Sequence, residues 1–534
     1  MPFRNQIGKD VFDHKYKYRE GNCGTWEELS HTLVHRVCDK YMIKKEINEL
    51  IKIVTDMKFI PAGRYLYYAG REAAFFNNCM TFIAEDSREG WAELAHKHFM
   101  SLMAGGGCGT YYGKIRPRGR SISKTGGDAS GPIPLMMAMN EIGRHVRQGG
   151  SRRSALFACL PYDHQDIEEF LHIKDWSDII IKAKSKDIDF PAPLDMTNIS
   201  IAYNSYESTN TDIFKKNVLQ ACKTSEPGFA FNFGSQVLDI ARNACAEVTS
   251  PWDSDVCNLG SVNMSRVNSI DEFEYICCLA NKFLICGSLE ADLPTEKMKL
   301  VRNMSRKIGL GLTGVHEWLI KRNYKYGFNT ELDNWLTYYE DTSSVADEFC
   351  STLGISPLSK YRSIAPAGTL SIIAGTTSGI EPVYAHGIKR KYLNGNKWRE
   401  ETFVDPTVKY LVEECGVDPD IIETSQDLAK DIERRVAFQA HMQDFVDMGI
   451  SSTINLPAWG SEFNNEDTVE STELIIRKYS GRLRGLTFYA DGSRGGQPLT
   501  AISYSEAIKF EQSITEDSVE VLESTSCKGG VCGI

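Results

Sequence analysis

The stretch N-A-C-A-E at residues 243–247 places an amide, a thiol and a carboxylate at alternate positions. In an extended loop alternate side chains point the same way, so we expect Asn243, Cys245 and Glu247 to face one site. A lone cysteine with Asn and Glu is a poor zinc set, and neither C-x2-C nor H-E-x-x-H occurs in the sequence. A hydrolytic cysteine would need a nearby histidine base, whereas the nearest candidate in sequence is Glu247. This pattern favours hydrogen-atom or redox chemistry at Cys245.

The other cysteines fall into two groups according to whether their sequence neighbours are apolar or polar. The chain has 15 cysteines at irregular spacing, which is unlike a secreted disulfide framework, and most should be reduced and buried. Helix-like apolar patterns surround Cys38, Cys222, Cys277, Cys278, Cys286 and Cys350, and we interpret these as packing residues, as we do Cys108 in AGGGCG. Polar or glycine-rich surroundings mark Cys79, Cys257, and the pair Cys527 and Cys532, spaced C-x4-C at the end of the sequence. Such a tip cannot support a core, so we expect it to carry chemistry.

Composition limits the partners of this protein. The formal net charge of −11 over 534 residues argues against a nucleic acid or an acidic membrane surface as partner. No apolar run approaches the roughly 18 residues needed to cross a bilayer. We therefore expect a cytoplasmic protein that binds neither nucleic acid nor membrane.

The elements that must hold these residues follow from hydrophobic periodicity. From Thr25 apolar residues recur at helical spacing, and Thr25 with Glu28 forms a capping box. Between about Phe59 and Asp491, strand-like runs alternate with amphipathic helical stretches, which predicts one large α/β domain with much parallel sheet. After Tyr504 the chain is acidic and rich in Ser and Thr, which indicates a flexible arm.

Eight motifs in one order along the chain together resemble the catalytic chain of a ribonucleotide reductase. They are Asn243-x-Cys245-x-Glu247, Cys257 in CNLGS, Cys79, AGGGCG, QGGSRRSA, PAGTLSIIAGTTSGIEP, GLTFYADGSR and the terminal C-x4-C. The resemblance implies a ten-stranded α/β barrel of two five-stranded parallel halves, antiparallel to each other, with Cys245 on a catalytic finger loop inside. It divides the chain into a helical N-terminal region (1–60), the barrel (61–504) and a flexible tail (505–534).

By this resemblance, Cys245 becomes a thiyl radical that abstracts the 3′ hydrogen of a ribonucleotide. Glu247 takes the proton of the 3′-hydroxyl as general base, and Asn243 hydrogen-bonds the substrate. Cys79 and Cys257 supply two reducing equivalents as the 2′-hydroxyl leaves as water, and they end as a disulfide.

The resemblance also assigns the terminal pair. Cys527 and Cys532 reduce the buried disulfide by thiol–disulfide exchange and pass the oxidation to thioredoxin or glutaredoxin. A flexible segment of about 20 residues reaches roughly 25 Å, enough to cross half of such a domain. The alternative is a disordered end with two incidental cysteines.

The resemblance also assigns nucleotide binding to three further segments. The substrate and its phosphates contact Ala62, Gly63, Asn78 and Gly107 on one side and Pro366, Ala367, Gly368, Thr369, Leu370 and Ser371 on the other. A helix that begins near Gly368 would offer free N–H groups to a phosphate, whereas the alternative is an ordinary capped turn. Gln148, Gly149, Gly150, Ser151, Arg152 and Arg153 form the loop that relays a deoxynucleoside triphosphate or ATP effector, and its alternative is a solvated basic face.

Members of this family differ in how the radical is made. Types with a separate metallo-subunit need two adjacent redox-active tyrosines, but here Phe488 precedes Tyr489 and phenylalanine has no O–H. The motifs YADGSR, MKFIPAGRYLYYAG and IAGTTSGIEP resemble the adenosylcobalamin-dependent type. We therefore expect adenosylcobalamin as cofactor, whose homolysis gives a deoxyadenosyl radical that oxidises Cys245, and no metal held by side chains. Ala244 and Ala246 stand where the family usually has Pro and Gly, which predicts a changed loop conformation without lost function.

Other interpretations stay open. The runner-up is the large catalytic subunit of a two-subunit reductase, and another class is a thiol redox or metal-binding regulatory protein. Gly309, Gly311 and Gly314 match the dinucleotide fingerprint G-x-G-x-x-G, but a charged, helix-like segment precedes them. We expect a tight turn there, and a dehydrogenase is disfavoured. The sequence does not distinguish a monomer from a homodimer, or a diphosphate from a triphosphate substrate.

Overall fold

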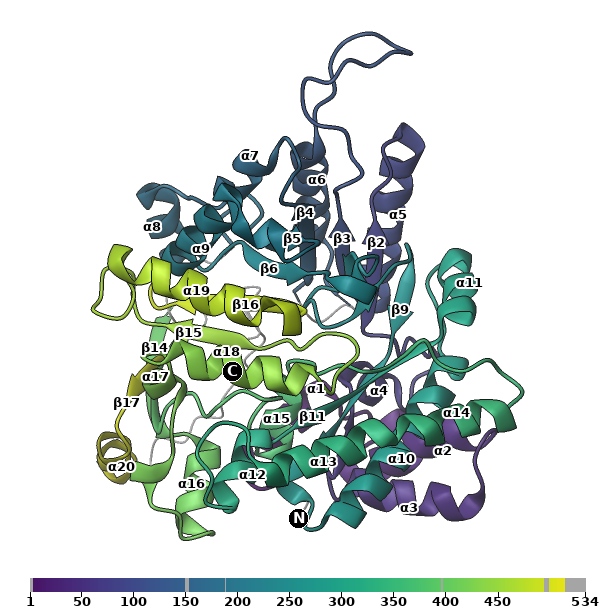
Figure 1. Cartoon of the computed structure of the whole chain (residues 1–534). Helices are drawn as coiled ribbons and strands as arrows, with labels where there is room; N and C mark the ends of the chain where they lie inside the picture. Colours follow the sequence, from purple (N-terminus) through teal and green to yellow (C-terminus); the bar gives the residue numbers. More distant parts are fainter. Residues whose placement is uncertain (1–2, 149–152, 188, 395–396, 494–498, 514–534) are drawn as a thin grey trace.

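The computed structural model describes residues 3–148, 153–187, 189–394, 397–493 and 499–513 (Figure 1). The N-terminal part is helical, as expected, with α1 (Gln6–Lys15), α2 (Trp26–Cys38) and α3 (Lys44–Thr55). The capping box at the start of α2 is confirmed, since the Thr25 side chain accepts from the Glu28 backbone N–H and Glu28 caps the Thr25 N–H. These helices lead into strand β1 (Phe59–Pro61) and helix α4 (Gly63–Tyr68).

A parallel sheet forms the upper half of the molecule in Figure 1. Its strands are β2 (Cys79–Ile83), β3 (Gly107–Tyr111), β4 (Leu156–Pro161), β5 (Thr197–Tyr203) and β6 (Gly228–Phe231), each parallel to the next. The helices between them are α5 (Arg88–Ala104), α6 (Pro132–His145), α7 (Ile167–His172), α8 (Asp178–Lys186) and α9 (Asp212–Thr224). Parallel neighbouring strands require such crossover connections, and these helices account for the alternation of strand-like and helical segments seen in the sequence.

A second set of parallel strands forms the lower half. It contains β10 (Leu259–Asn263), β11 (Lys307–Thr313), β12 (Lys360–Arg362), β15 (Thr453–Leu456) and β16 (Gly485–Ala490). β10, β11 and β12 pair in parallel, an isolated parallel bridge joins Ile364 to Ile450 beyond β12, and β15 pairs in parallel with β16.

Two antiparallel pairings join the halves. β16 pairs with β6 on one side, and β9 (Asp255–Cys257), which directly precedes β10, pairs with β2 on the other. The two parallel sets therefore run in opposite directions and meet at both edges. The result is a mixed α/β fold.

The predicted tight turn at the G-x-G-x-x-G motif is wrong. Gly309 and Gly311 lie inside the buried strand β11, and only Gly314 has a left-handed backbone, with φ +70°. A Cβ at Gly309 would overlap the Leu259 side chain, and one at Gly311 would lie 2.7 Å from the Ser363 carbonyl oxygen. These glycines allow close strand packing, and the expected preceding helix is α11 (Glu296–Ser305).

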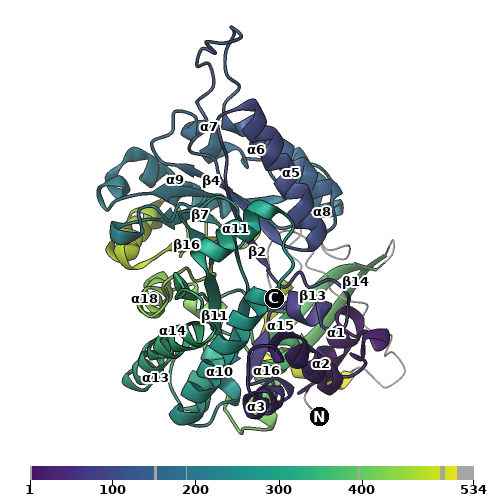
Figure 2. The same ribbon diagram turned by 90° about the vertical axis from the view of Figure 1, so that its right-hand side faces the viewer.

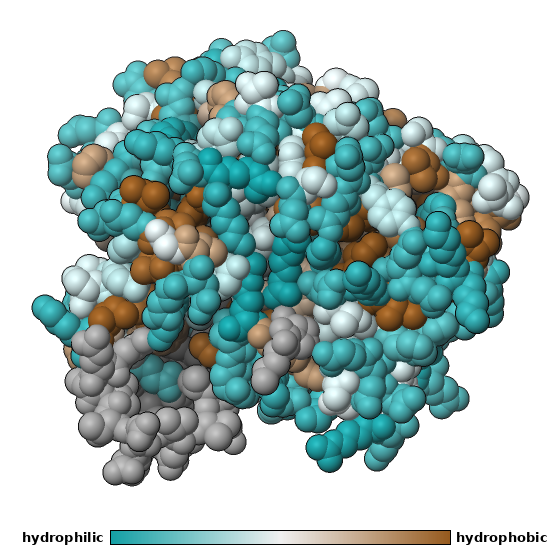
Figure 3. Space-filling view, turned by 90° about the horizontal axis from the view of Figure 1, so that it is seen from below, coloured by the Kyte–Doolittle hydropathy of each residue, from teal (hydrophilic) through white to brown (hydrophobic). Residues whose placement is uncertain are grey.

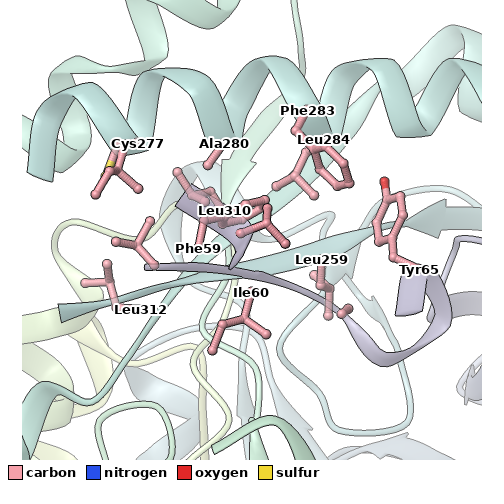
Figure 4. Close-up of a cluster of buried hydrophobic side chains, with 14 of the residues drawn as sticks. Phe59, Ile60, Tyr65, Leu259, Cys277, Ala280, Phe283, Leu284, Leu310 and Leu312 are labelled. Atoms are coloured by element: carbon pink, nitrogen blue, oxygen red, sulfur yellow. The ribbon is translucent and has the colours of Figure 1, made fainter. Parts of the chain in front are cut away.

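Helix α10 (Ile270–Glu290) covers the lower strands (Figure 4). Its side chains Phe283 and Leu284 point toward Phe59 of β1 and Leu310 of β11, and all four are fully buried. Full burial of such a side chain stabilises the fold by about 1.5–3 kcal/mol. The cysteines Cys277 and Cys286 are buried on this helix, and Cys38, Cys222 and Cys350 are buried on others, as expected of packing residues.

The remaining elements surround these halves (Figure 2). They are α12 (Val315–Lys321), α13 (Thr330–Asp341), α14 (Ser343–Thr352), α15 (Gly368–Ala374), α16 (Pro406–Glu413), α17 (Ser425–Leu428), α18 (Ile432–Gln443), α19 (Val469–Tyr479) and α20 (Tyr504–Ser513), and the antiparallel strands β13 (Gly387–Asn394), β14 (Lys397–Val404) and β17 (Leu499–Ile502). Within the described ranges, no helix has the length and apolar character that a membrane span requires. Seen from below, hydrophobic residues lie in small groups among hydrophilic ones (Figure 3).

Candidate active site

Cys79 and Cys257 face each other across two strands. Cys79 begins β2, Cys257 ends β9, and the two are directly opposite in the antiparallel register. Opposite residues of such a pair have Cα atoms about 4.5–5.5 Å apart, within the range that a disulfide spans. Both thiols are free, and their residues are only 3% and 0% exposed. The pair can therefore close and reopen without a large backbone movement.

The loop that carries residues 243–247 is a tight turn, so the expectation of an extended loop is wrong. The short strands β7 (Ala241–Arg242) and β8 (Thr249–Ser250) pair at its base. The Ala246 N–H donates to the Asn243 carbonyl at 3.0 Å, and Ala246 has a left-handed backbone with φ +63°. This conformation favours glycine, the residue that the family usually has at this position, and it is unfavourable for alanine.

Glycines of neighbouring strands leave room for this turn. A Cβ at Gly109 of β3 would overlap the Arg242 carbonyl oxygen and lie 2.7 Å from the Asn243 carbonyl carbon. A Cβ at Gly107 would lie 2.9 Å from that of Ala244, and one at Gly449 would lie 2.9 Å from the Ala246 carbonyl oxygen. Gly107 and Gly109 of AGGGCG therefore make room for the loop directly, by close approach.

Asn243 and Glu247 both contact Cys79. The Asn243 amide donates to Cys79 Sγ at 3.0 Å, while its oxygen accepts from the Val248 N–H at 2.9 Å and so fixes the amide orientation. Cys79 Sγ in turn donates to Glu247 Oε1 at 3.7 Å. Asn243 and Glu247 are each 2% exposed. Asn243, Cys79 and Glu247 thus form one buried, hydrogen-bonded group, with Cys257 opposite Cys79.

The electrostatics of this group fit acid–base work. Burial raises the pKa of Glu247 from 4.5 to about 7, despite hydrogen bonds that oppose the rise. The second carboxylate oxygen, Oε2, is buried and has no hydrogen-bond partner among the described residues. Burial, and next the charge of Glu247, raise the pKa of the Cys79 thiol well above its usual value. A carboxyl that titrates near neutrality, with one open acceptor, suits a general base.

Cys245 differs from its neighbours in being only partly buried. It is close enough for its charge to raise the pKa of Cys79, as the charge of Cys257 also does. The tip of the turn is therefore partly open to solvent, while Asn243, Glu247 and the two strand cysteines are almost fully buried.

Some of the predicted substrate residues lie on elements next to this group. Gly107 lies opposite Cys79 in the β2–β3 register, and its N–H donates to the Asn78 carbonyl at 2.8 Å. The Ala62 N–H donates at 3.0 Å to the carbonyl of Leu259, the first residue of β10, and Gly63 follows as the first residue of α4. The segment Pro366 to Ser371 leads into α15, which begins at Gly368, and the cap residue Ala367 makes no side-chain cap. Thr369, Leu370 and Ser371 form its first turns, and no atom lies within 4 Å of a Cβ built at Gly368.

Several predicted residues lie outside the described ranges, namely Gly149, Gly150, Ser151, Arg152, Cys527 and Cys532. At the borders of the effector loop, the Gln148 amide donates to the Gly105 carbonyl at 3.1 Å, and Arg153 pairs with Asp189. Cys108 is fully buried in the core, as expected of a packing residue.

Sequence reasoning missed residues that hold the turn from behind. The Glu247 carbonyl accepts from the Gly449 N–H at 2.7 Å and from Ser363 Oγ at 3.1 Å. Ser363 comes just before the predicted phosphate segment, so its position could have suggested a role.

A fully buried ion pair of Lys307 and Asp255, 2.6 Å apart, lies on the strands beside Cys257. Nothing in the one-dimensional pattern marks that lysine as buried.

The stretch GLTFYA forms β16. Phe488 is 1% exposed in the core and lies opposite Ile454 of β15, while Tyr489 is partly buried opposite Asn455. No group of three or more His, Cys, Asp or Glu side chains that could hold a metal occurs in the described part of the chain.

Comparisons with known proteins agree with this geometry. The family model "Ribonucleotide reductase, barrel domain" matches residues 77–185, 211–336 and 358–489, more than half of the chain. A protein of Thermoplasma acidophilum named "Vitamin B12-dependent ribonucleoside-diphosphate reductase" is 27% identical over 91% of this chain and 72% of its own. An "Adenosylcobalamin-dependent ribonucleoside-triphosphate reductase" of Euglena gracilis is 24% identical over 94% of this chain and 81% of its own.

A solved structure shares the fold. The "Actinobacillus ureae class Id ribonucleotide reductase alpha subunit" superposes with a TM-score of 0.71 over 91% of this chain and 97% of its own, at 17% identity. Family match, relatives and fold lead to one conclusion. The chain belongs to the ribonucleotide reductase family, carries its barrel domain, and is a ribonucleotide reductase.

Proposed function

We propose that this chain reduces ribonucleotides through a thiyl radical on Cys245, started by adenosylcobalamin. The observation that carries the proposal is the contact of Cys79 with both Asn243 and Glu247, together with its position opposite Cys257. A base, an amide and a reducible cysteine pair then share one buried site beside a partly exposed thiol.

In this proposal each residue has one task. The Cys245 thiyl takes the 3′ hydrogen atom, and Glu247 takes the 3′-hydroxyl proton on its open oxygen. The 2′-hydroxyl leaves as water after a proton transfer from the cysteine pair. Cys79 and Cys257 give two electrons and two protons in all and become a disulfide, after which Cys245 returns the hydrogen to C3′. The balance is one ribonucleotide and two thiols giving one deoxyribonucleotide, one water and one disulfide.

Several observations support adenosylcobalamin as the source of the radical. Several relatives carry vitamin B12 or adenosylcobalamin dependence in their names. Cys245 is partly open to solvent, and the phenyl ring of Phe488 cannot relay a radical from another subunit. When bound, the cofactor supplies a carbon-centred radical strong enough to take the hydrogen atom of a thiol. The chain's own part is to present Cys245 to it and to keep the other thiols buried.

The further parts of the proposal concern binding and architecture. The strand pairings support a ten-stranded barrel of two five-stranded halves with residues 243–247 on a finger loop, preceded by a helical region (1–60) and followed, beyond the barrel (61–504), by a tail (505–534). The segments around Ala62, Gly107 and Gly368 bind the nucleotide, residues 148–153 respond to an effector, and the tail cysteines exchange with thioredoxin or glutaredoxin. A cytoplasmic location belongs to this proposal, since such reductants work there.

The test uses the purified chain, adenosylcobalamin, dithiothreitol and a ribonucleoside diphosphate or triphosphate, without a second protein. We expect a deoxyribonucleotide from the wild type and none from Cys245→Ser, because an alcohol O–H is too strong a bond to form the radical. No product with the cofactor, but product after addition of a metallo-subunit, would establish the two-subunit alternative instead. Product by neither route, with cysteines that still oxidise, would leave a thiol regulatory protein.

A further inference from the structure

The Lys307–Asp255 ion pair is a built and fully buried unit. Each side chain is 1% exposed, and Lys307 Nζ lies 2.6 Å from Asp255 Oδ2. Lys307 also donates to the Thr249 carbonyl at 3.1 Å, and Asp255 accepts from the hydroxyls of Ser250 at 2.6 Å and Ser305 at 2.7 Å. Charges are buried in this way only when they are well hydrogen-bonded, and removing one partner alone is strongly destabilising.

This pair lies beside Cys257. Asp255 and Cys257 are two residues apart on β9 and so point to the same face, as do Lys307 and Gly309 on β11. The two faces meet, because a Cβ at Gly309 would lie 3.5 Å from Cys257 Sγ while Lys307 pairs with Asp255. Lys307 is therefore a fixed positive charge on the Cys257 side of the cysteine couple.

The two cysteines consequently have different surroundings. Cys79 Sγ accepts from Asn243, contacts the Glu247 carboxylate, and belongs to a residue that is 3% exposed. Cys257 is 0% exposed. Burial raises the pKa of the Cys257 thiol, and the charge of Lys307 is the largest effect that opposes the rise. The charged groups that act on Cys257 are Lys307, Asp255, Glu247 and Asp447.

Resting on the proposed function of this cysteine pair, we infer that Lys307 sets the direction in which the Cys79–Cys257 disulfide is opened. The thiolate of a reducing thiol attacks Cys79 Sγ and forms a new S–S bond with it. The Cys79–Cys257 bond breaks, and its electron pair leaves on Cys257 Sγ as a thiolate, on which the charge of Lys307 acts. A second thiolate of the reductant then attacks the mixed disulfide, frees Cys79, and leaves the reductant as a disulfide, while the two protein sulfurs take up two protons.

Physical organic chemistry supports this direction. In thiol–disulfide exchange the sulfur that leaves faster is the one whose thiolate is better stabilised, and access decides which sulfur is attacked. Lys307 stabilises the leaving thiolate at Cys257, and the slight exposure of Cys79 favours attack there. Through Thr249 and Ser250 the same ion pair also fixes β8, the strand that ends the catalytic turn, so the charge keeps its place relative to residues 243–247.

The experiment traps the intermediate without the cofactor. The full chain is oxidised with diamide, exposed briefly to 2-mercaptoethanol, and quenched with N-ethylmaleimide in denaturant, after which peptide mass spectrometry locates both labels. In the wild type we expect mercaptoethanol on Cys79 and maleimide on Cys257, in several-fold excess over the reverse arrangement, because access and leaving-group stability act in the same direction. Mercaptoethanol mainly on Cys257 would overturn the inference.

Two double variants separate charge from structure. Lys307→Met with Asp255→Asn removes both charges together, so no buried charge is left alone, and we expect the several-fold preference to fall toward equal labelling. The control, Lys174→Met with Glu226→Gln, removes another buried pair at 2.6 Å and should keep the wild-type preference. If the folded Lys307→Met, Asp255→Asn variant keeps the wild-type preference, this inference is overturned but the proposed function is not. If the oxidised wild type contains no Cys79–Cys257 disulfide, the proposed roles of the two cysteines fail as well.

Discussion

Replacement of Glu247 by glutamine should stabilise the protein while it removes activity. Burial raises the pKa of this carboxyl from 4.5 to about 7, so its ionised form is disfavoured in the folded state. Below pH 4.5 the group is neutral in both states and has no effect. Between pH 4.5 and about 7 the unfolded chain ionises first, stability is lost as pH rises, and the loss is complete above pH 7.

The size of the effect follows from these values. At about 1.36 kcal/mol per pKa unit, ionisation of Glu247 destabilises the folded chain by about 3 kcal/mol at alkaline pH, of which roughly 2.5 kcal/mol appears between pH 5 and pH 8. For 534 residues the unfolding entropy is about 1.1 kcal/mol/K, so 2.5 kcal/mol corresponds to roughly 2 °C in melting temperature. Glutamine has no charge to bury and should recover this difference.

Thermal unfolding followed by circular dichroism at pH 5 and pH 8 measures the effect. The melting temperature of Glu247→Gln relative to wild type should rise by roughly 2 °C from pH 5 to pH 8, while turnover falls by about 10²–10⁴-fold because the base is lost. The control Glu433→Gln removes an exposed carboxylate paired with Lys478 at 2.7 Å, whose pKa is lowered, and it should gain nothing at pH 8. A gain that is equal at both pH values would refute the burial argument.

Three further changes test separate parts of the account. Cys527→Ser should stop thioredoxin-driven turnover but leave turnover with dithiothreitol, and equal loss with both reductants would contradict the tail assignment. Gly109→Ala should abolish turnover by displacing the catalytic turn, whereas Gly481→Ala, where a Cβ meets no atom within 4 Å, should leave the rate unchanged. Ala246→Gly should raise the free energy of unfolding by up to about 1 kcal/mol in denaturant titrations, since φ +63° is unfavourable for alanine, and a loss of stability would show that the turn is not strained.

The sequence predicted which residues meet but not why they meet. Alternation in an extended loop was the argument for bringing Asn243 and Glu247 together, yet the loop is a turn closed by the Ala246 N–H. Both side chains nonetheless contact Cys79, because β7 and β8 hold the ends of the turn beside β2 and β3. Local patterns carry no information on this placement, which depends on strands far apart in the chain.

Long-range strand pairing also accounts for the other features of the structure that the sequence did not predict. The register that sets Cys79 opposite Cys257 joins strands 178 positions apart, so spacing alone could not give it. The charged, helix-like segment before the glycines of β11 suggested a turn there, but these glycines lie in a strand and relieve contacts with Leu259 and Ser363. Nothing in the local sequence marks Lys307 as buried, and its pairing with Asp255 is what makes burial acceptable.

The most direct measurement of the central claim is a single turnover without reductant. The prereduced chain is given ribonucleotide and adenosylcobalamin, quenched with N-ethylmaleimide in denaturant, and mapped by peptide mass spectrometry while the deoxyribonucleotide is quantified. In Cys527→Ser, where the tail cannot exchange, the account predicts one Cys79–Cys257 disulfide for each deoxyribonucleotide formed. Product without that disulfide, or with a disulfide between other cysteines, would contradict it.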